Sequence, residues 1–478
     1  MATVPGRPNV LLVFMDDMTH WALASGQVAT PNLDRLVQRG TRFSHAFNQG
    51  SWSGAVCVPA RAMLLSGRTL FHAPRNTVEN WAGISTPADV FRAAGYQTFF
   101  TGKWHQPEHL LHTAYDQVGP YGPGMLAPAA DEHGCVDVGR PEPGNDWDPT
   151  DTTLGGHWLR DGDGQVVHSS QRWADAAIGF LTDRARRPAA VATAPGRDRA
   201  RPFFLHLAFH APHDPRQSPP AWLDAYPPQD IRIPPTAWPE HPFDQGDHLI
   251  RDELLAPIPR TEEAIRTHRR EYFAILSHAD AQIGRVLDEL DRQGLTDDTV
   301  VAFSGDHGLA LGEHGLMGKQ SCYDHSVRVP LVLAGPGVPA GQVCDDLVYQ
   351  ASIYATLCDL TGVAPPAGLE FPSLVPLLAR PDAAPPTEVA ETAVFVGYKD
   401  FQRLIRTRTH ALIAYRDARR VQLFDLTTDP WQAHDLAGEP ARRDLIDRLL
   451  ARLRERQAAL DDDGGDWTAD IDERWFAS

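Results

Sequence analysis

The sequence predicts an α/β fold: a large, mainly parallel sheet sandwiched by helices, with a smaller C-terminal subdomain of antiparallel sheet plus helix. Short apolar strands alternate with helical segments through the first two-thirds of the 478 residues, a pattern typical of βαβ units. After a Pro/Ala-rich passage at 365–386, the pattern changes to closely spaced strand-like segments. We therefore expect a large domain over 1–375 and an α+β subdomain over 376–478.

The large domain begins with a strand and a helix. Residues 9–15 are predicted to form a strand buried on both faces, because their apolar run from Val10 to Met15 stops at two aspartates. Residues 31–39 have a proline in their first turn and Gly40 after their end, which predicts a helix. The alternation then continues with a helix at 86–95, strands at 96–100, 203–209 and 299–304, and a long helix at 261–293.

Three stretches interrupt this alternation. Residues 119–170 are rich in Gly, Pro and Asp, residues 183–202 are biased toward Ala, Arg and Pro, and residues 214–260 carry many prolines. We interpret them as surface insertions, some of which shape a cleft. In the subdomain we expect one amphipathic helix at 441–460 and strands at 393–398, 402–407, 411–415 and 421–425.

Composition excludes several classes of function. The net charge of −18 argues against nucleic acid as a partner, because binding phosphates along a backbone requires a basic face. The five cysteines are odd in number and scattered, so they predict no disulfide framework. No apolar run approaches the roughly 18 residues of a membrane span. As written, the chain is predicted to be a cytoplasmic protein without a membrane partner; a trimmed signal peptide is the open alternative.

Two acidic clusters follow predicted strands. Asp16 and Asp17 come directly after the strand at 9–15, and Asp306 and His307 come after the strand at 299–304. Sites of open α/β sheets lie at the carboxyl ends of strands, and adjacent carboxylates repel each other unless a cation neutralises them. These residues could complete one metal site. The alternative for each cluster is a solvated turn or a helix cap.

A third cluster centres on Cys57, which lies two residues before Pro59. Pro59 is well placed to start a helix, which would put Cys57 just before the positive end of the helix dipole. The alternative is that Cys57 is a small buried hydrophobic residue. A cysteine-protease site would need a paired histidine pattern that the sequence does not show.

A fourth set consists of cationic groups after strands. Lys103 and His105 follow the strand at 96–100, His210 and His213 follow the strand at 203–209, and Lys319 lies in a glycine-flanked loop. Only three of the 44 basic residues are lysines, yet two of them fall in these loops. Together the four clusters predict a metal ion held by carboxylates, the N-terminus of a helix, and a ring of lysine, arginine and histidine side chains. A site of this composition is suited to binding an ester of a tetrahedral oxyanion.

The ordered motifs resemble the type I (formylglycine-dependent) sulfatase family of the alkaline-phosphatase superfamily. The segment Cys57-Val58-Pro59-Ala60-Arg61 is similar to the signature in which that family oxidises a cysteine to formylglycine, and Leu65-Ser66-Gly67-Arg68 fits its continuation. The order Asp-Asp, Gly-Lys-x-His, Ala-Pro-His and Ser-x-Asp-His-Gly also follows the family. Near the C-terminus, Leu423-Phe424-Asp425-Leu426 resembles a family segment as well.

The resemblance implies a metal site and a reaction. Ca²⁺, with Mg²⁺ as the alternative, would be held by the hydrated formylglycine at position 57 and by Asp16, Asp17, Asp306 and His307. Many members have Asn where His307 stands, so this ligand departs from the commoner pattern. One hydroxyl of the hydrated aldehyde would attack sulfur, and the sulfated intermediate would then collapse to aldehyde and sulfate.

The resemblance also implies roles for the surrounding side chains. Arg61 would steady the formylglycine, and Lys103 and Lys319 would contact sulfate oxygens. His213, with or without Lys319, would protonate the leaving alcohol, and His105 would take the proton of the second hydroxyl. His210 is expected to line the substrate pocket.

We therefore predict a sulfuric ester hydrolase whose preferred substrate is a sulfated saccharide, matured by a formylglycine-generating enzyme. The alternatives are a phosphonate or phosphate ester hydrolase of the same superfamily, and an aryl sulfate hydrolase. A further alternative is a catalytically silent anion-binding protein in which Cys57 is never converted. The oligomeric state is left open.

Overall fold

The computed structural model describes residues 6–23, 26–75, 77, 79–126, 147–153, 155–182, 201–379 and 393–476. Parts of the stretches predicted as insertions at 119–170 and 183–202, and part of the Pro/Ala-rich passage at 365–386, lie outside these residues. Within the described helices, none is both long and apolar enough to cross a bilayer.

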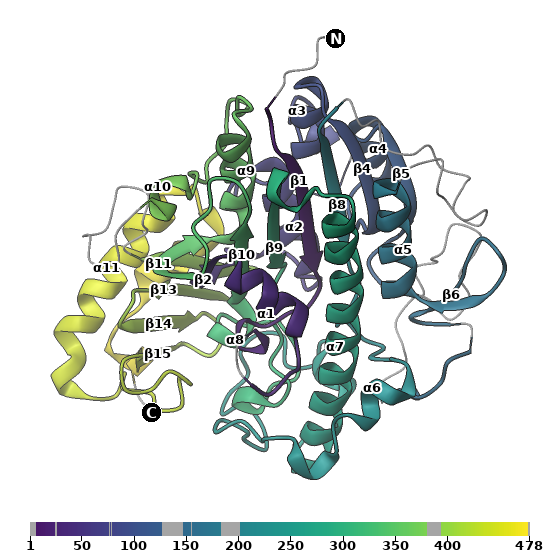
Figure 1. Cartoon of the computed structure of the whole chain (residues 1–478). Helices are drawn as coiled ribbons and strands as arrows, with labels where there is room; N and C mark the ends of the chain where they lie inside the picture. The colour runs from purple at the N-terminus through teal and green to yellow at the C-terminus, as the bar shows by residue number, and fades with distance from the viewer. Residues whose placement is uncertain are drawn as a thin grey trace.

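The centre of the molecule is an eight-stranded sheet in the order β11-β2-β10-β9-β1-β8-β4-β5 (Figure 1). β1 lies between β8 and β9 and is parallel to both, and β10 is the one strand of this sheet that runs in the opposite direction. The predicted fold class is confirmed. The strands are β1 (Asn9–Met15), β2 (Gly40–Phe47), β4 (Gln97–Lys103), β5 (Gln117–Gly122), β8 (Phe203–Ala208), β9 (Thr299–Gly305), β10 (Arg328–Ala334) and β11 (Gln342–Tyr349).

Helices cover both faces of this sheet, which is why β1 is apolar from Val10 to Met15. Leu11 and Val13 pack with α1 (Pro31–Gln38), α5 (Ser169–Leu181) and α7 (Glu262–Arg292), which lie in front of the sheet in Figure 1. Leu12 and Phe14 face the opposite layer. That layer contains α2 (Cys57–Ser66), α3 (Pro87–Ala93), α4 (Glu108–Ala114) and α9 (Ile353–Thr361).

The smaller sheet is a meander of β12 (Val394–Tyr398), β13 (Gln402–Arg406), β14 (His410–Tyr415) and β15 (Arg420–Asp425), covered by α11 (Arg443–Ala459). These are the strands and the helix that the sequence predicts for this region, with boundaries shifted by one or two residues. A fifth strand, β3 (Gly50–Ser51), adds to β12 in parallel. It comes from the segment just before Cys57, so the small sheet contacts the N-terminal part of the chain directly.

Helix starts mostly follow the predicted signals. The Thr86 hydroxyl accepts a hydrogen bond from the Asp89 amide, and Asp89 bonds back to Thr86, so α3 begins with a capping box before Pro87. The helix near position 57 differs: it begins at Cys57 itself, and Pro59 lies inside its first turn. The helix therefore begins two residues earlier than predicted, and the prediction that Cys57 precedes the helix is wrong.

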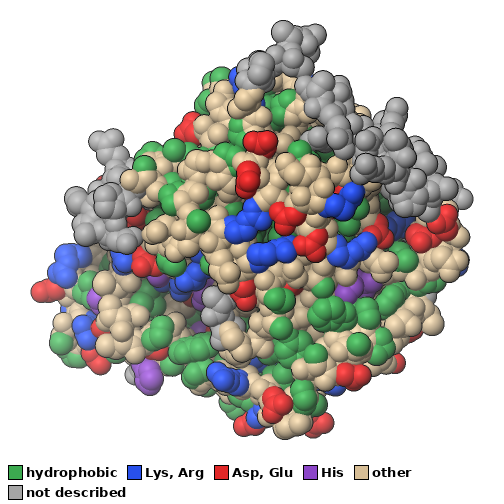
Figure 2. Space-filling view, in the orientation of Figure 1, with side chains coloured by type: hydrophobic (Ala, Val, Ile, Leu, Met, Phe, Trp, Pro, Cys, Tyr) green, Lys and Arg blue, Asp and Glu red, His purple; other side chains and the backbone are tan. Residues whose placement is uncertain are grey.

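Four strands of the large sheet are not predicted from the sequence: β2, β5, β10 and β11. β5 overlaps the stretch at 119–170 that we interpret as a surface insertion. β10 contains Pro330, where its register with β2 shifts, and a proline within an apolar run argues against a strand. β2 and β11 mix apolar with charged residues because parts of both lie near the sheet edge. The remaining short elements are α6 (Pro220–Asp224), α8 (Asp324–Val327), α10 (Val375–Leu378) and the hairpin β6 (Trp158–Arg160) and β7 (Val166–His168). On the face shown in Figure 2, acidic and basic side chains are intermingled.

Candidate active site

The predicted site residues gather at the carboxyl ends of the parallel strands. Asp16 and Asp17 follow β1, Lys103 ends β4, His213 follows β8 and Asp306 follows β9. Each of these side chains is at most 4% exposed. The same holds for Cys57, Arg61, His307 and Lys319. His105 is half-buried.

Strand pairing explains why carboxylates almost 300 positions apart meet. Met15 of β1 is paired with Gly305 of β9, and the Asp306 amide then donates to the Met15 carbonyl at 3.0 Å. Beyond the strand ends, the Asp17 amide donates to Asp306 Oδ1 at 3.1 Å. Asp17 adopts a positive φ of 53°, a backbone conformation that persists only where its surroundings hold it.

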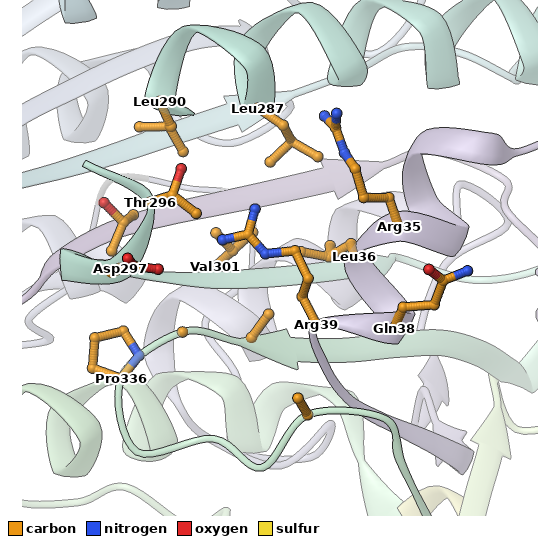
Figure 3. A pocket seen from close by; sticks show the side chains of 14 residues that line it. Arg35, Leu36, Gln38, Arg39, Leu287, Leu290, Thr296, Asp297, Val301 and Pro336 are labelled. Carbon is orange, nitrogen blue, oxygen red and sulfur yellow. The ribbon is translucent and has the colours of Figure 1, made fainter. Parts of the chain in front are cut away.

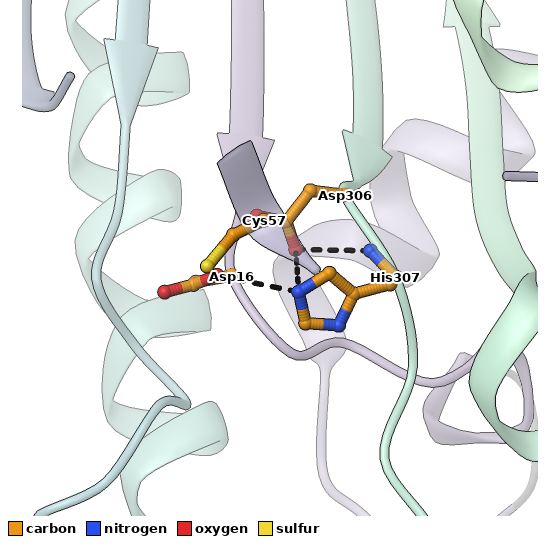
Figure 4. Close-up of side chains that lie close together, drawn as sticks. All are labelled: Asp16, Cys57, Asp306 and His307. Atoms are coloured by element: carbon orange, nitrogen blue, oxygen red, sulfur yellow. Dashed lines mark hydrogen bonds and ion pairs between the residues drawn. The ribbon is translucent and has the colours of Figure 1, made fainter. Parts of the chain in front are cut away.

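His307 completes this acidic group (Figure 4). Its Nε2 atom lies 3.5 Å from Asp306 Oδ1 and 4.0 Å from Asp16 Oδ1, and Figure 4 shows the imidazole directed at both carboxylates. The potential ligand atoms of Asp16, Cys57, Asp306 and His307 all lie within 4.8 Å of one another, as do those of Asp16, Asp17 and His213. The group therefore has the dimensions of a cation site.

Each of the three carboxylates also contacts a cationic side chain. Lys103 Nζ donates to Asp16 Oδ2 and lies 3.6 Å from Cys57 Sγ. Lys319 Nζ donates to Asp17 Oδ1 at 2.7 Å. Arg61 Nη2 lies 3.2 Å from Asp306 Oδ2, and its Nη1 donates to the Lys103 carbonyl at 2.9 Å. The cations are held around the carboxylates and next to the sulfur.

The glycine before Lys103 has a structural reason. Gly102 has a positive φ of 108°, and a Cβ atom there would lie 1.7 Å from the Ala208 carbonyl oxygen of the neighbouring strand. Any other residue would therefore separate β4 from β8. Glycine at this position lets Lys103 end β4 in contact with Asp16.

Burial and charge shift the pKa values of these groups strongly. Burial raises the pKa of Asp16, but Lys103 and other cations outweigh it and hold that pKa well below its usual range. Burial raises the pKa of the Cys57 thiol, but Lys103, Lys319 and His105 together outweigh it and hold that pKa well below its ordinary value. Burial and the Asp16 charge raise the pKa of Asp306 to about 8. Burial lowers the pKa of His307, but Asp306, together with Cys57 and Asp17, outweighs burial and raises this pKa to about 9. The raised pKa values of Asp306 and His307 indicate that the negative charge of the carboxylates in this cluster exceeds the positive charge of the nearby side chains.

Two carboxylate oxygens in the cluster, Asp16 Oδ1 and Asp17 Oδ2, are buried without a hydrogen-bond partner among the described residues, whereas Asp306 Oδ2 is compensated by its ion pair with Arg61. A buried carboxylate oxygen without a partner is costly unless a proton or a cation neutralises it. Oxygen donors of this kind are the ligands preferred by hard cations such as Ca²⁺. The residues present therefore fit a hard divalent cation.

The histidines occupy different surroundings. His213 Nδ1–H donates to the Asp214 carbonyl at 2.8 Å, and Asp214 accepts two hydrogen bonds from Arg251. His210 Nε2–H donates to the Pro123 carbonyl at 2.9 Å. His105 has a positive φ of 54°, and burial lowers its pKa. Of the three histidines, His213 is the one with a ring nitrogen within 4.8 Å of carboxylate oxygens of Asp16 and Asp17.

Sequence reasoning missed the residues that support His213 and Lys319. Arg251 and Asp252 lie in the stretch 214–260, where no motif marks them, and Asp252 accepts a hydrogen bond from Gln320. The one sequence feature that could have indicated such a supporting residue is the position of Asp214 directly after His213. The stretch predicted to shape a cleft therefore supplies buried charges next to the site.

A separate pocket lies at the opposite edge of the sheet, near the start of β9 and the end of α7 (Figure 3). Its volume is about 430 Å³, and its lining includes Arg35 of α1 and Arg39, which directly follows that helix. Arg35 pairs with Asp288 at 2.8 Å and Arg39 with Asp291 at 3.5 Å. None of the predicted site residues lines it.

Comparison with known proteins identifies what this arrangement resembles. A family model described as Sulfatase matches residues 8–363, and one described as N-sulphoglucosamine sulphohydrolase, C-terminal, matches residues 312–459. A choline-sulfatase of Rhizobium meliloti is 28% identical over 473 residues, covering 95% of this chain and 87% of the relative.

Two further comparisons agree. An iduronate 2-sulfatase of Mus musculus is 29% identical over 427 residues, covering 78% of this chain and 72% of the relative. A solved structure of a protein in complex with its substrate D-glucosamine-2-N,6-O-disulfate has a TM-score of 0.71 at 21% identity, covering 96% of this chain and 99% of that one. The structural match concerns the fold.

Proposed function

Because this chain belongs to the sulfatase family and is a sulfuric ester hydrolase, we propose that its nucleophile is a formylglycine made from Cys57. The observation that carries the proposal is the position of the Cys57 sulfur. It lies 3.6 Å from Lys103 Nζ, at the start of α2, and within 4.8 Å of potential metal-binding atoms of Asp16, Asp306 and His307. A hydrated aldehyde at this position offers a hydroxyl group to the sulfur of a bound ester.

We propose that Asp16, Asp17, Asp306 and His307 hold one Ca²⁺, with Mg²⁺ as the alternative. Support comes from the two buried carboxylate oxygens without a hydrogen-bond partner, Asp16 Oδ1 and Asp17 Oδ2, and from the oxygen-rich donor set. When bound, such an ion supplies positive charge that polarises the ester and favours a deprotonated nucleophile. His307 brings a nitrogen donor to a set that is otherwise oxygen, and its contacts with Asp306 and Asp16 keep it in the cluster.

The fixed cations bind and orient the sulfate group. Lys103 and Lys319 donate to different carboxylates of the pair, Lys103 to Asp16 and Lys319 to Asp17. Arg61, placed one helical turn after Cys57, contacts Asp306 and steadies the residue at position 57. Because these donors are buried and preorganised, they stabilise charge developing on the transferred oxygens without reorganisation.

The histidines move protons. His213 donates a proton to the leaving alcohol, and its Nδ1 contact with the Asp214 carbonyl leaves Nε2 for this task. His105 takes a proton from the second hydroxyl at position 57; burial lowers its pKa, so it stands ready as a neutral base. Lys319 assists the leaving group from the side of Asp17.

We propose a sulfated saccharide as the substrate. Support comes from the iduronate 2-sulfatase relative and from the family model described as N-sulphoglucosamine sulphohydrolase, C-terminal. Turnover of sulfated monosaccharides should be compared with that of choline sulfate, an aryl sulfate and matched phosphate and phosphonate esters. A preference of kcat/KM for a phosphonate or phosphate ester over its sulfate counterpart would contradict the assignment.

The nucleophile is tested by mass spectrometry of the tryptic peptide 43–61, which contains Cys57. Conversion by a formylglycine-generating enzyme replaces one sulfur and two hydrogens with one oxygen. Protein co-expressed with such an enzyme should show this mass change in proportion to its specific activity. Full activity of a preparation whose peptide retains the thiol would overturn the proposed nucleophile and favour another one.

A further inference from the structure

A second group of metal-binding side chains lies away from the active site. Glu313 and His314 belong to the short helix η8 (Glu313–Gly315), and His325 belongs to α8. Their potential ligand atoms all lie within 4.8 Å of one another, and each side chain is at most 4% exposed. The proposed reaction uses none of the three, so their convergence needs a separate explanation.

The distances within this group suit a small tetrahedral ion. His314 Nδ1 lies 3.3 Å from His325 Nδ1, and Glu313 Oε2 lies 4.0 Å from His325 Nδ1. Two nitrogen ligands about 2.0–2.1 Å from a tetrahedral Zn²⁺ are about 3.3 Å apart. The imidazole pair already has this separation, and the carboxylate needs a shift of less than about 1 Å to reach the same ion.

The outward-facing atoms of the same side chains are held by other groups. His314 Nε2–H donates to the Gln432 carbonyl at 3.1 Å, and His325 Nε2 is 3.1 Å from Ser321 Oγ. Glu313 Oε1 accepts a hydrogen bond from Trp21 Nε1 at 2.9 Å. Zinc-binding histidines commonly have their second nitrogen fixed by an oxygen in this way, which aims the first nitrogen at the metal.

We propose that Glu313, His314 and His325 bind one Zn²⁺ that has a structural role. Two nitrogen donors favour zinc over the hard oxygen-seeking cations Ca²⁺ and Mg²⁺. Three protein ligands leave the fourth tetrahedral position to a water molecule. The rival explanation for the short imidazole contact is a single N–H···N hydrogen bond between neutral rings, with no ion bound.

The position of this site gives it a consequence for the active site. Glu313 and His314 lie at the tip of a turn closed by hydrogen bonds from Gly312 to Leu316 and from Ala310 to Gly318, directly before Lys319. Through His314 and Gln432 the tip is also tied to the chain beyond β15. A zinc ion here would link this turn, which directly precedes Lys319, to α8, which contains His325.

The test is metal binding by the full-length protein, without reference to turnover. Protein stripped with a chelator is incubated with Zn²⁺ or Co²⁺ in excess Ca²⁺, freed of unbound metal by gel filtration and analysed by elemental mass spectrometry and visible absorption. We expect one Zn²⁺ per chain, a tetrahedral Co²⁺ spectrum and a higher melting temperature with zinc. Wild-type protein that stays folded but retains no stoichiometric Zn²⁺ or Co²⁺ would overturn the proposal, and the hydrogen-bonded imidazole pair would explain the contact.

Variants assign the metal to this site. His314→Gln and His325→Gln should each lose the Co²⁺ spectrum, whereas His434→Gln, at an exposed histidine, should keep it. Asp306→Asn should also keep it, because Asp306 belongs to the other cluster. Loss of the spectrum in Asp306→Asn together with its retention in both histidine variants would place the ion in the active site and refute the second site. If a histidine variant does not fold, the wild-type stoichiometry and the Asp306→Asn spectrum still decide.

Discussion

Lys103 and Asp16 form an ion pair in which neither side chain is exposed to solvent. The ammonium group also lies 3.6 Å from the Cys57 sulfur, so it sits between the carboxylate and the residue that we propose as the nucleophile. Desolvated charges interact more strongly than exposed ones, so a pair at this position would orient both the carboxylate that we propose as a metal ligand and the sulfate group of the proposed substrate.

Replacing Lys103 with arginine should be almost as damaging as replacing it with alanine. A compact ammonium fits between Asp16 and Cys57, whereas a planar guanidinium needs more room and a fork-shaped partner. We expect Lys103→Arg to lower kcat by ~10²–10³, the typical effect of losing one preorganised donor. Steady-state kinetics on one sulfate ester measure this.

The control is Lys399→Arg. Lys399 is paired with Asp247 at 2.7 Å, outside the active-site cluster, and conserving its charge should leave kcat close to the wild-type value. Near-wild-type kcat for Lys103→Arg would show that lysine is incidental at position 103.

Cys57→Ser should abolish turnover while leaving the fold and the metal-binding cluster in place. Serine is close in size to cysteine but is not oxidised by a cysteine-specific enzyme, so no hydrated aldehyde forms. Co-expression with a formylglycine-generating enzyme should raise the specific activity of the wild type and not of the variant. Equal activities of the two proteins would contradict the proposed nucleophile, because a serine hydroxyl would then suffice.

Asp17→Asn and Asp306→Asn should each weaken Ca²⁺ binding. Each change removes one negative charge from a set whose affinity depends on ligand charge. We expect a loss of at least the ~10–100-fold that removal of an outer contact typically costs. Isothermal titration calorimetry with Ca²⁺ measures it, and Asp288→Asn, at an exposed carboxylate paired with Arg35, should bind like the wild type. Unchanged affinity in both site variants would exclude this cluster as the calcium site.

The sequence predicts the centre of this site because the relevant side chains follow strands. β1 and β9 are short apolar runs, and once they pair in parallel their ends bring Asp17 and Asp306 into contact. The signature around Cys57 indicates the chemistry in the same way. Strand ends and short motifs are local properties of the chain, and local properties are what sequence patterns report.

The rest depends on irregular segments whose path no local pattern encodes. The pairing of Asp214 with Arg251 joins two points of a proline-rich stretch, and the convergence of His314 with His325 requires a left-handed residue at 314. The parallel addition of β3 to the small sheet involves two residues, too few for any periodicity. These features become visible only when the tertiary contacts are known.

Arg251→Met should destabilise the protein strongly. Arg251 pairs with Asp214, whose side chain is 3% exposed, and also with Asp252. Removing one partner of a buried ion pair leaves an uncompensated charge, at a typical cost of about 3 kcal/mol. The midpoint of urea unfolding should fall accordingly. Arg35→Met removes an exposed pair with Asp288 and should cost about 0–1 kcal/mol. Equal shifts for the two variants would show that Asp214 is stabilised by other groups.

His72 should make stability depend on pH near neutrality. Its ring lies 2.8 Å from Glu370 and 2.9 Å from Asp461, linking the segment after α2 to the end of α11. Partial burial lowers the pKa of His72, but Asp461 and Glu370 outweigh it and raise the folded-state pKa above the ordinary value. A raised histidine pKa stabilises the fold fully below the unfolded pKa of about 6.5, and this contribution is lost as the pH rises through the higher folded pKa. Since the partners are solvent-exposed, the effect should be at most about 1 kcal/mol.

The urea midpoint of the wild type should therefore exceed that of His72→Gln at about pH 6 and converge with it at about pH 8.5. Asp461→Asn should reduce the same difference, because it removes one of the two carboxylates. A gap between wild type and His72→Gln that stays constant over this range would mean that the ring contributes by packing and not by its charge.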